Sequence, residues 1–505
     1  MRIIIKQIII HFGILVILFC ITKDLNSKVI EVCPTGPIRN LENATINVQP
    51  GDTIMMRSGV YTTSSYIPML QGTADRWITL TAKDNEEVVF RGQSTAMQLS
   101  DPAYLRISKL NFESQTANGV NIDDGGSYET PANNIIIENC EWRSMNASGN
   151  NDMLKMSGVD HFIIRNCKFS NGSAGGSGID FVGCHFGIIE NCIFENQGSN
   201  SIQNKGATSQ ITIQKNLFIN GGFRALNIGG STGLDFFRPL GTKYEAKEIF
   251  VYSNIFIGSQ APIAFVGSIN CDVVNNTIYL PAKWAIRILQ ENTNEGFAKC
   301  SNNSFVNNVV YVNNSASNPT LNIGSNTIPE TFYFANNLWY NRDNNNWVGP
   351  NLPVSETNGI KNIDPIISED SKKGIIINKS SQVDGKGKEV EFPKEDFESN
   401  LFNSPRSIGA IEVNPKTNTI FDQISDFVAY PNPATNQILI ELPIINTNLY
   451  NDYINIKIYN ISGECVYSGN RAIKSKLIRI DLTNLQTGMY FLLMNNKFVK
   501  FSIER

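Results

Sequence analysis

The chain has 505 residues, which is more than one ordinary domain, so several domains or an extended repeat are expected. The formal net charge is −4 and no long run of Lys and Arg occurs, which argues against a nucleic-acid-binding protein. Nine Cys occur without any C-x-x-C pair, so the sequence shows no cysteine metal site.

The N-terminus has the pattern of a secretory signal peptide. It reads "MRIIIKQIIIHFGILVILFCITKDLNSK", with Arg2 and Lys6 before an apolar run that ends near Ile21. This run is shorter than the ~20 apolar residues of a membrane span. Residues 1–27 are therefore predicted to be a signal peptide rather than a membrane anchor, and no transmembrane span is expected in the mature chain.

A repeat follows, marked by one large apolar residue every 22 to 38 positions. These anchors are Phe112, Trp142, Phe169, Phe194, Phe218, Phe256, Ile278, Val310 and Trp339. Two positions before them stand Leu110, Cys140, Cys167, Cys192, Asn216, Asn254, Asn276, Asn308 and Asn337. The period and the short β-branched and aromatic bursts predict an all-β solenoid of stacked parallel strands. In such a stack the Asn side chains are expected to hydrogen-bond from coil to coil.

Several phrases connect this repeat to a known architecture. They are "VQPGDTIMMRSGVY" (48–61), "GTADRWITLTA" (72–82) and "SPRSIGAIE" (404–412). With the repeats, the first two resemble the right-handed parallel β-helix of polysaccharide lyases, and the third resembles the tail that follows such β-helices. Residues 28–412 are accordingly predicted to form a right-handed parallel β-helix domain with its C-terminal tail.

The C-terminal residues follow a different pattern. Apolar residues alternate in "YPNPATNQILIEL" (430–442), "INIKIYNISGECVYSG" (454–469) and "IRIDLTNLQTGMYFLLM" (478–494), which predicts a small antiparallel β-sandwich over 426–505 after a linker at 413–425. These phrases resemble the type A C-terminal sorting domain of the type IX secretion system. The resemblance implies a periplasmic intermediate, export by the type IX machinery, and delivery to the cell surface or the medium.

One strand of each coil predicts a polar surface. If its second residue points into the core, the next points outward. The outward positions form a first column, Asn121, Lys155, Asp180, Gln203, Asn227, Ala264 and Arg287, and a second column, Asp123, Ser157, Val182, Lys205, Gly229, Val266 and Leu289. Such columns are typical of a substrate groove, although a merely solvated face would have the same composition.

The stretch "ALNIGGSTGLDFFRPLGTKYEAKE" (225–248) interrupts the repeat in the longest gap, between Phe218 and Phe256. Extra residues between coils must leave the solenoid as a loop, and long loops in compact folds are usually functional or disordered. The insertion is predicted to form one wall of a substrate cleft beside the polar columns, with these side chains contributing: Phe236, Phe237, Arg238, Lys243, Glu245 and Lys247.

The available side chains limit the chemistry. Only His161 and His185 remain after removal of the signal peptide, and neither G-x-S-x-G nor H-E-x-x-H occurs. β-Elimination on a uronate needs a base, neutralisation of the carboxylate and a proton for the leaving oxygen. Lys and Arg can serve all three roles when burial or neighbouring cations lower the pKa of the lysine.

The segment "SIQNKGATSQITIQKNLFINGGFRALNIGG" (201–230) resembles the catalytic coils of polysaccharide lyase family 6, which includes alginate lyases and chondroitinase B. The resemblance implies that Lys205 is the base and Arg224 the acid. The family also places acidic calcium ligands just upstream of its lysine, where this chain has Gly198 and Asn200, so a calcium requirement stays open. The proposed substrate-binding residues are Lys155, Asp180, Asn200, Gln203, Asn227, Arg238, Glu245 and Arg287.

Two alternatives remain at this stage. A non-catalytic, adhesin-like surface glycan binder would use aromatic platforms, for which Phe236, Phe237 and Trp284 are candidates. A β-helical glycoside hydrolase would need clustered Asp side chains, and the candidates are Asp123, Asp124 and Asp180. The cationic residues favour an anionic polysaccharide, such as alginate, a glycosaminoglycan or pectate, as substrate.

Overall fold

The computed structural model describes residues 27–127, 129–316, 319–415, 427–441, 453–461, 465–472, 477–494 and 497–505. The predicted signal peptide therefore lies outside the described residues except for Ser27, and so does most of the predicted linker. No helix within the described ranges is long and apolar enough to cross a membrane.

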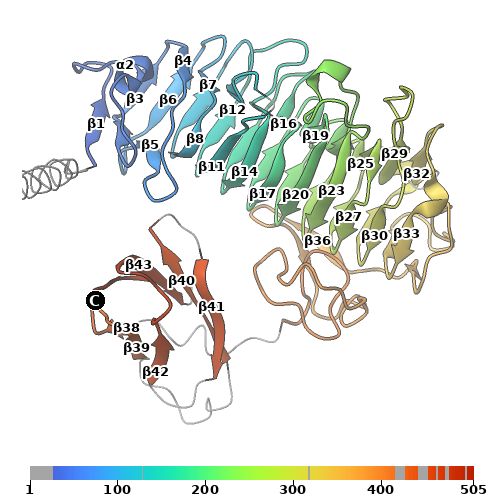
Figure 1. Cartoon of the computed structure of the whole chain (residues 1–505). Coiled ribbons are helices and arrows are strands. Elements are labelled where there is room, and N and C mark those ends of the chain that lie inside the picture. Colours follow the sequence, from blue (N-terminus) through green and yellow to red (C-terminus); the bar gives the residue numbers. More distant parts are fainter. Residues whose placement is uncertain are drawn as a thin grey trace, which may run out of the picture.

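Three parallel sheets wind the chain from Val29 to Lys361 into a stack of coils (Figure 1). Sheet A consists of β1 (Val29–Val32), β2 (Thr53–Met56), β5 (Ile78–Ala82), β8 (Ala103–Ser108), β11 (Ala132–Glu138), β14 (Val159–Arg165), β17 (His185–Glu190), β20 (Thr208–Gln214), β23 (Ala246–Tyr252), β27 (Asp272–Val274), β30 (Ser304–Val306) and β33 (Tyr333–Ala335), with β26 (Ser268–Ile269) beside β23.

Sheet B consists of β3 (Gly59–Tyr61), β6 (Val88–Arg91), β9 (Asn111–Glu113), β12 (Glu141–Arg143), β15 (Lys168–Ser170), β18 (Ile193–Glu195), β21 (Leu217–Ile219), β24 (Ile255–Ile257), β28 (Thr277–Tyr279), β31 (Val309–Val312), β34 (Leu338–Asn341) and β35 (Ile360–Lys361). Sheet C consists of β4 (Ser65–Pro68), β7 (Met97–Ser100), β10 (Val120–Asp123), β13 (Leu154–Ser157), β16 (Ser177–Val182), β19 (Asn200–Lys205), β22 (Arg224–Gly229), β25 (Ala261–Val266), β29 (Ile286–Leu289) and β32 (Leu321–Ile323). The predicted parallel β-helix is confirmed.

The repeated apolar anchors form the core beneath sheet B. Eight aromatic rings stack in a row, with consecutive centroids 4.6 to 5.5 Å apart: Tyr61, Phe90, Phe112, Trp142, Phe169, Phe194, Phe218 and Phe256. All are buried. Since one coil cannot bury such a ring alone, each coil depends on its neighbours for a continuous core.

The Asn ladder next to the aromatic row is also confirmed. The Nδ2 group of each ladder Asn donates to Oδ1 of the next, at 3.0 to 3.1 Å, along Asn216, Asn254, Asn276, Asn308 and Asn337. Glu356 ends the row by accepting from the backbone and side-chain amides of Asn337. The ladder therefore supplies the hydrogen bonds that this buried corner needs.

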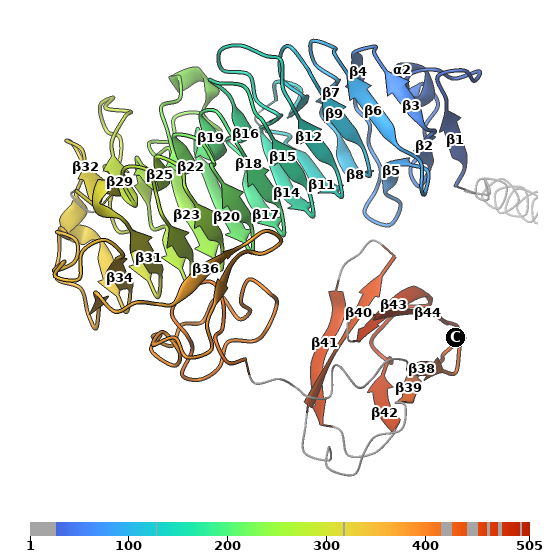
Figure 2. The ribbon, with the colours of Figure 1, turned by 180° about the vertical axis from the view of Figure 1, so that it is seen from behind.

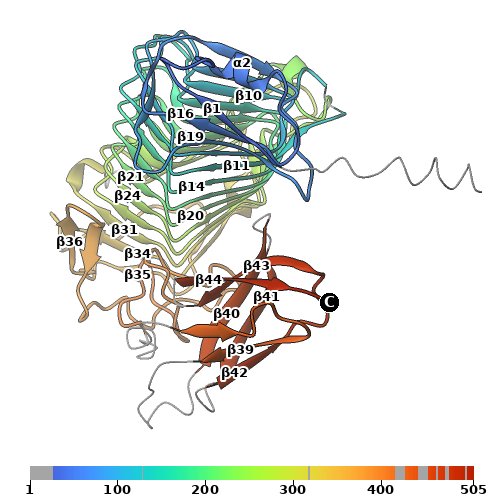
Figure 3. The same cartoon turned by 90° about the vertical axis from the view of Figure 1, so that its left-hand side faces the viewer.

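Other elements cover the ends and one side of the stack. Helix α2 (Leu41–Thr45) lies at the N-terminal end (Figure 3), with Asn40 as its N-cap. The tail packs on sheet B through Ile375, Ile377 and Ile408, and includes the hairpin of β36 (Ile367–Asp370) and β37 (Gly374–Ile377) (Figure 2). Within the described part of the chain, short 3-10 helices occur in connections at Leu234–Phe236, Asn314–Ala316 and Pro329–Thr331.

The C-terminal residues form two antiparallel sheets that share one apolar core. One sheet contains β38 (Val428–Tyr430), β39 (Gln437–Glu441) and β42 (Leu477–Asp481). The other contains β41 (Cys465–Ala472), β40 (Tyr453–Asn460), β43 (Gly488–Met494) and β44 (Lys497–Ile503). This arrangement confirms the predicted β-sandwich.

Candidate functional site

The strand register of sheet C reproduces both columns expected from the sequence. Lys155 pairs with Asp180, Asp180 with Gln203, and Gln203 with Asn227. In the second column, Val182 pairs with Lys205. Because neighbouring parallel strands lie ~4.8 Å apart, side chains on adjacent coils of one column are in contact distance.

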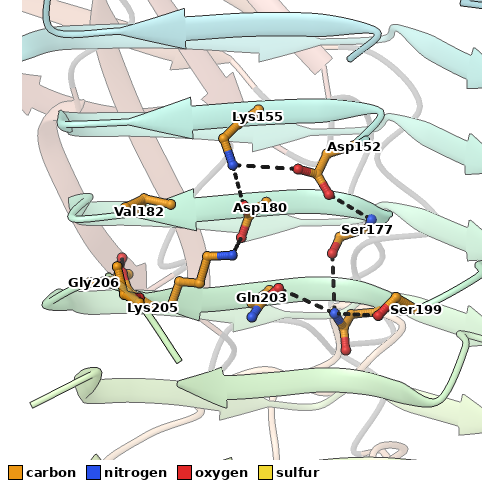
Figure 4. A network of polar contacts seen from close by, with 12 residues as sticks. Asp152, Lys155, Ser177, Asp180, Val182, Ser199, Gln203, Lys205 and Gly206 are labelled. Atoms are coloured by element: carbon orange, nitrogen blue, oxygen red, sulfur yellow. Dashed lines mark hydrogen bonds and ion pairs between the residues drawn. The ribbon is translucent and has the colours of Figure 1, made fainter. Parts of the chain in front are cut away.

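Four charged side chains form a connected cluster on this face (Figure 4). Asp180 is fully buried at its centre, and its Oδ2 lies 2.5 Å from the Lys155 Nζ. Its Oδ1 lies 3.2 Å from the Nζ of Lys205. Lys155 also approaches Oδ2 of Asp152, at 3.6 Å. The cluster thus alternates carboxylate and ammonium groups over three successive coils, and we call it the charge quartet.

Burial and mutual interaction perturb two members of the charge quartet. Burial and the neighbouring Asp180 carboxylate raise the pKa of Asp152 to about 6. Burial lowers the pKa of Lys155, but the carboxylates of Asp180 and Asp152 outweigh this effect and leave it raised. Lys155 is therefore a firmly held cation, whereas Asp152 changes charge in mildly acidic solution.

Lys205 ends β19, where the chain turns from sheet C toward sheet A. The coil below carries Gly229 and Gly230 beside it, and both have positive φ. A Cβ at Gly230 would lie 3.4 Å from Lys205 Cβ and 2.7 Å from Gln203 Nε2. A Cβ at Gly229 would clash with the Val266 carbonyl at 1.7 Å. Gly230 therefore keeps the space next to Lys205 free of a side chain, whereas Gly229 allows the close approach of the next coil at Val266.

Arg224 begins β22 and pairs with Asn200 one coil above. Its Nη1 donates to Asn227 Oδ1 at 3.1 Å, and its Nη2 lies 2.6 Å from Oε1 of Glu291. Asn227 is almost completely buried, whereas Glu291 is partly exposed. Arg224 thus lies on the coil adjacent to Lys205 and is oriented by an amide and a carboxylate.

Asn200 and Gln203 connect the charge quartet with the Arg224 end of the face. Asn200 Nδ2 donates to the hydroxyl oxygens of Ser177 and Ser199, each at 3.2 Å. The same group lies 3.4 Å from Gln203 Oε1 (Figure 4). Asn200 is nearly buried and Gln203 partly exposed, so only Gln203 presents substantial polar surface to the solvent.

Arg287 lies farther along the first column, on β29. Its Nε donates to Asn322 Oδ1 at 2.9 Å, and its guanidinium stands 4.7 Å from the ring centre of Trp284. Lys283 Nζ lies 4.2 Å from the same ring. Burial and the nearby Arg224 lower the pKa of Arg287. This end of the face is therefore cationic.

The insertion does not lie where the sequence predicted. Arg238 is buried and contacts Asp160, His185 and the Gly183 carbonyl, at the corner between sheets C and A. Phe237 is also buried, against Phe297. The insertion packs over the turns that follow the strands instead of forming a wall above the columns.

Glu245 and Lys247 also depart from the expectation. Glu245 is completely buried, and its carboxylate accepts hydrogen bonds from the Gly206 amide, the Thr232 amide and hydroxyl, and the Asn292 side chain. Lys247 lies in β23 of sheet A and pairs with Glu248. Glu245 therefore fastens the insertion to the turn after Lys205 and has no free surface for a substrate.

The residues upstream of Lys205 do not fit the calcium site that the resemblance implies. Gly198 has no side chain, and the Asn200 amide donates to hydroxyl groups. The carboxylates of Asp152 and Asp180 are already matched by lysine ammonium groups. Among the residues that the structure describes, no three His, Cys, Asp or Glu side chains are grouped to hold a metal ion.

Sequence reasoning named Asn200, Arg224 and Trp284 separately but did not recognise that they share a third column, three positions before the first. It contains Asp152, Ser177, Asn200, Arg224, Ala261 and Trp284, and the Ser177 amide donates to the Asp152 carboxylate from one coil to the next. Extending the strand register three residues upstream would have found it. Glu291 was also missed, because it approaches Arg224 from a connection after β29.

The comparisons with known proteins concern two parts of the chain. Residues 37–211 match the family model described as Chondroitinase B, and residues 428–502 match the one described as Secretion system C-terminal sorting domain. Both resemblances stated from the sequence are thereby confirmed. The first match includes Lys205 and ends before Arg224. No curated protein sequence matches the chain.

Solved structures with a similar course of the chain include several carbohydrate-related proteins. The pectate lyase Pel9A has 12% identity and a TM-score of 0.44, with 77% of this chain and 97% of that chain covered. XylC, in complex with xylose, has 11% identity and a TM-score of 0.48, with coverage of 76% and 98%. A variant of the PL6 family alginate lyase AlyGC has 13% identity and a TM-score of 0.41, with coverage of 80% and 64%.

Proposed function

We propose that this chain is an exported polysaccharide lyase that cleaves an anionic, uronate-containing polysaccharide by β-elimination. The observation that carries the proposal is the placement of Lys205 and Arg224 on adjacent coils of one outward face, with Lys205 inside the segment that matches Chondroitinase B. The two residues lie at opposite ends of their strands, but their side chains converge: Lys205 reaches Asp180 and Arg224 reaches Asn227, the neighbours of Gln203 on either side in the first column. The two groups are thus about two coil spacings, ~10 Å, apart, and one sugar with its leaving oxygen could lie between them.

The C-terminal domain accounts for export. Residues 428–502 are a secretion-system sorting domain, which directs the chain through type IX secretion to the cell surface or the extracellular space. An extracellular location gives the face of sheet C access to polymers that do not enter cells.

Removal of the sorting domain should prevent export but leave the β-helix folded. A chain lacking residues 426–505 keeps the complete β-helix core, which shares no apolar cluster with the sandwich. We expect this truncated chain to accumulate in the periplasm of its host, as measured by cell fractionation and immunoblotting beside the full chain. Truncated protein on the cell surface would contradict the sorting role.

In the proposed reaction Lys205 is the base, and Arg224 has two tasks, as the acid and as a partner of the uronate carboxylate. The neutral amine of Lys205 removes the proton from C5 of the uronate, and the electron pair of that bond forms the C4–C5 double bond. The bond between C4 and the bridging oxygen then breaks, and Arg224 provides a proton to that oxygen. Arg224 and the amides of Gln203 and Asn227 stabilise the negative charge that develops on the carboxylate.

Substrate binding is proposed to continue along the first column toward Arg287. Arg287 is a cation on this face that contacts Asn322 and the Trp284 ring, and the nearby Glu291 carboxylate is paired with Arg224. It lies three coils from Gln203, or ~15 Å along the stack. An anionic group several sugar units from the cleavage point would pair with it, as guanidinium groups favour carboxylates and sulfates.

The two alternatives have less support. A hydrolase needs two carboxyl groups that face one bond, but Asp180 is fully buried between lysines, and Asp123 is hydrogen-bonded by Gln98 and Ser100. An adhesin would use several aromatic platforms, but Phe237 is buried and cations stand against the ring of Trp284, which leaves Phe236, 67% exposed, as the single open ring among the three candidates.

A panel of uronate polysaccharides tests the proposal. The purified chain is incubated with alginate, pectate and glycosaminoglycans, and the product is followed near 235 nm, where the unsaturated uronate absorbs. We expect absorbance to rise with at least one of them. New reducing ends without this absorbance would show a hydrolase, and binding with neither product would show a carbohydrate-binding protein.

A further inference from the structure

Lys205 faces charges of both signs that are fixed in the solenoid. Asp180, on the coil above, is in direct contact with it, at 3.2 Å. Lys155 lies one coil farther, and its Nζ is 2.5 Å from Oδ2 of the same Asp180 carboxylate. Lys155 also forms an ion pair with Asp152. All four side chains are largely or completely shielded from water, so their mutual interactions are weakly screened.

The remaining charged groups near Lys205 have other partners. Arg224, on the coil below, is paired with Glu291. Glu245 binds the Gly206 amide behind the turn, and Arg238 is paired with Asp160. The cationic neighbours expected from the sequence to activate Lys205 are thus engaged elsewhere, and a carboxylate occupies the position next to its ammonium group.

We infer that Asp180 is a positioning residue that keeps Lys205 in its charged form, and that Lys155 opposes it, so that this pair sets the pH at which the base of the reaction forms. The inference rests on the proposed role of Lys205 as that base. A carboxylate in contact with an amine favours the ammonium form, whereas a second ammonium sharing that carboxylate weakens the effect.

Two substitutions should shift the base in opposite directions. Asp180→Asn removes the negative charge and leaves Lys155 and Lys205 as neighbouring cations, so Lys205 should become neutral at a lower pH. Lys155→Met removes the other lysine partner of Asp180, so the carboxylate interacts with Lys205 alone and Lys205 should become neutral at a higher pH. A purely structural role would not give shifts of opposite sign.

Two readouts keep this inference separate from the proposed function. The first is the pH at which Lys205 in the full chain is half-labelled by trace acetic anhydride, as quantified by mass spectrometry of the peptide that contains it. The second is the acidic limb of kcat/KM on the substrate found by the panel. Ser157→Ala, a neutral change on the same strand as Lys155, is the control and should leave the labelling curve unchanged.

The outcomes are distinguishable. Opposite shifts in labelling support the inference even if no polysaccharide is cleaved, in which case only the proposed function fails. Labelling curves that stay unchanged, or that move in the same direction in both variants, overturn the inference even if the enzyme is active. If the buried Asp180→Asn change prevents folding, Lys155→Met still decides, since an unchanged or downward shift contradicts the inference.

Discussion

Replacing Lys205 with Ala is expected to reduce turnover by about 10²–10⁴-fold, the usual loss when a general base is removed. The coil should still form, because the Lys205 side chain points outward from sheet C and the core residues Ile202 and Asn204 of the same strand are unchanged. Asp180 retains Lys155 as its partner. The rate is measured near 235 nm on the substrate found by the panel, beside the melting temperature.

Two further variants test whether Lys205 acts as a base or only as a positive charge. Lys205→Arg keeps a cation next to Asp180 but cannot become neutral in this pH range, so it should be as inactive as the alanine variant while binding substrate. Lys168→Ala removes a partly exposed lysine of sheet B, far from the face, and should leave the rate unchanged. Full activity of the Lys205→Ala chain would place the base elsewhere.

The fold was predictable because every coil must bury a large apolar side chain in the same place. A ring such as Phe169 or Phe194 is buried only when a similar ring stacks above and below it, so the sequence must restore an apolar anchor in every coil. The Asn residues two positions before the anchors repeat for a related reason, since each buried amide needs the next as its hydrogen-bond partner.

The outward columns of sheet C were predictable from the same regularity. Within a strand the side chains alternate strictly, so one inward residue fixes the direction of its neighbours, and Lys155, Asp180 and Gln203 align as expected. Asp180 is nevertheless fully buried between two lysines and is not open to a substrate as predicted. The alternation does not extend to the first residues of these strands, and the alignment of Asp152 and Ser177 with Asn200 and Arg224 in a third column was therefore not recognised. Ion partners were not predictable either, because a Lys or Arg side chain can reach several coils.

The position of the insertion could not be predicted from the sequence. Its length required a loop, but length does not determine the side to which a loop folds. Arg238 and Glu245 were interpreted as surface charges, yet both are buried, since Asp160 and a set of backbone and side-chain donors satisfy them. A charged residue beside paired aromatic residues is thus consistent with packing against the solenoid as well as with a binding wall.

Because the insertion is packed in this way, a second large effect, a loss of stability, is expected when Glu245 is replaced. Glu245→Ala would leave three buried donors without an acceptor: the amides of Gly206 and Thr232 and the Thr232 hydroxyl. The Asn292 side chain would keep its longer hydrogen bond to the Thr232 carbonyl. Each unsatisfied buried group costs about 1–3 kcal/mol, so local stability should fall by about 3 kcal/mol or more. The insertion should open and become a site of proteolysis.

The turn that carries Lys205 should loosen at the same time, because Gly206 directly follows Lys205 and is held by the Glu245 carboxylate. We expect faster amide exchange at residues 205–208 and a lower kcat, although Glu245 has no surface to contact a substrate. Lys243→Ala is the matched control in the same segment, since its exposed side chain contacts only the Phe297 ring among its described interactions. If Glu245→Ala leaves exchange and proteolysis like those of the control chain, the insertion is not fastened through this carboxylate, and the placement of Lys205 must depend on the sheet C hydrogen bonds alone.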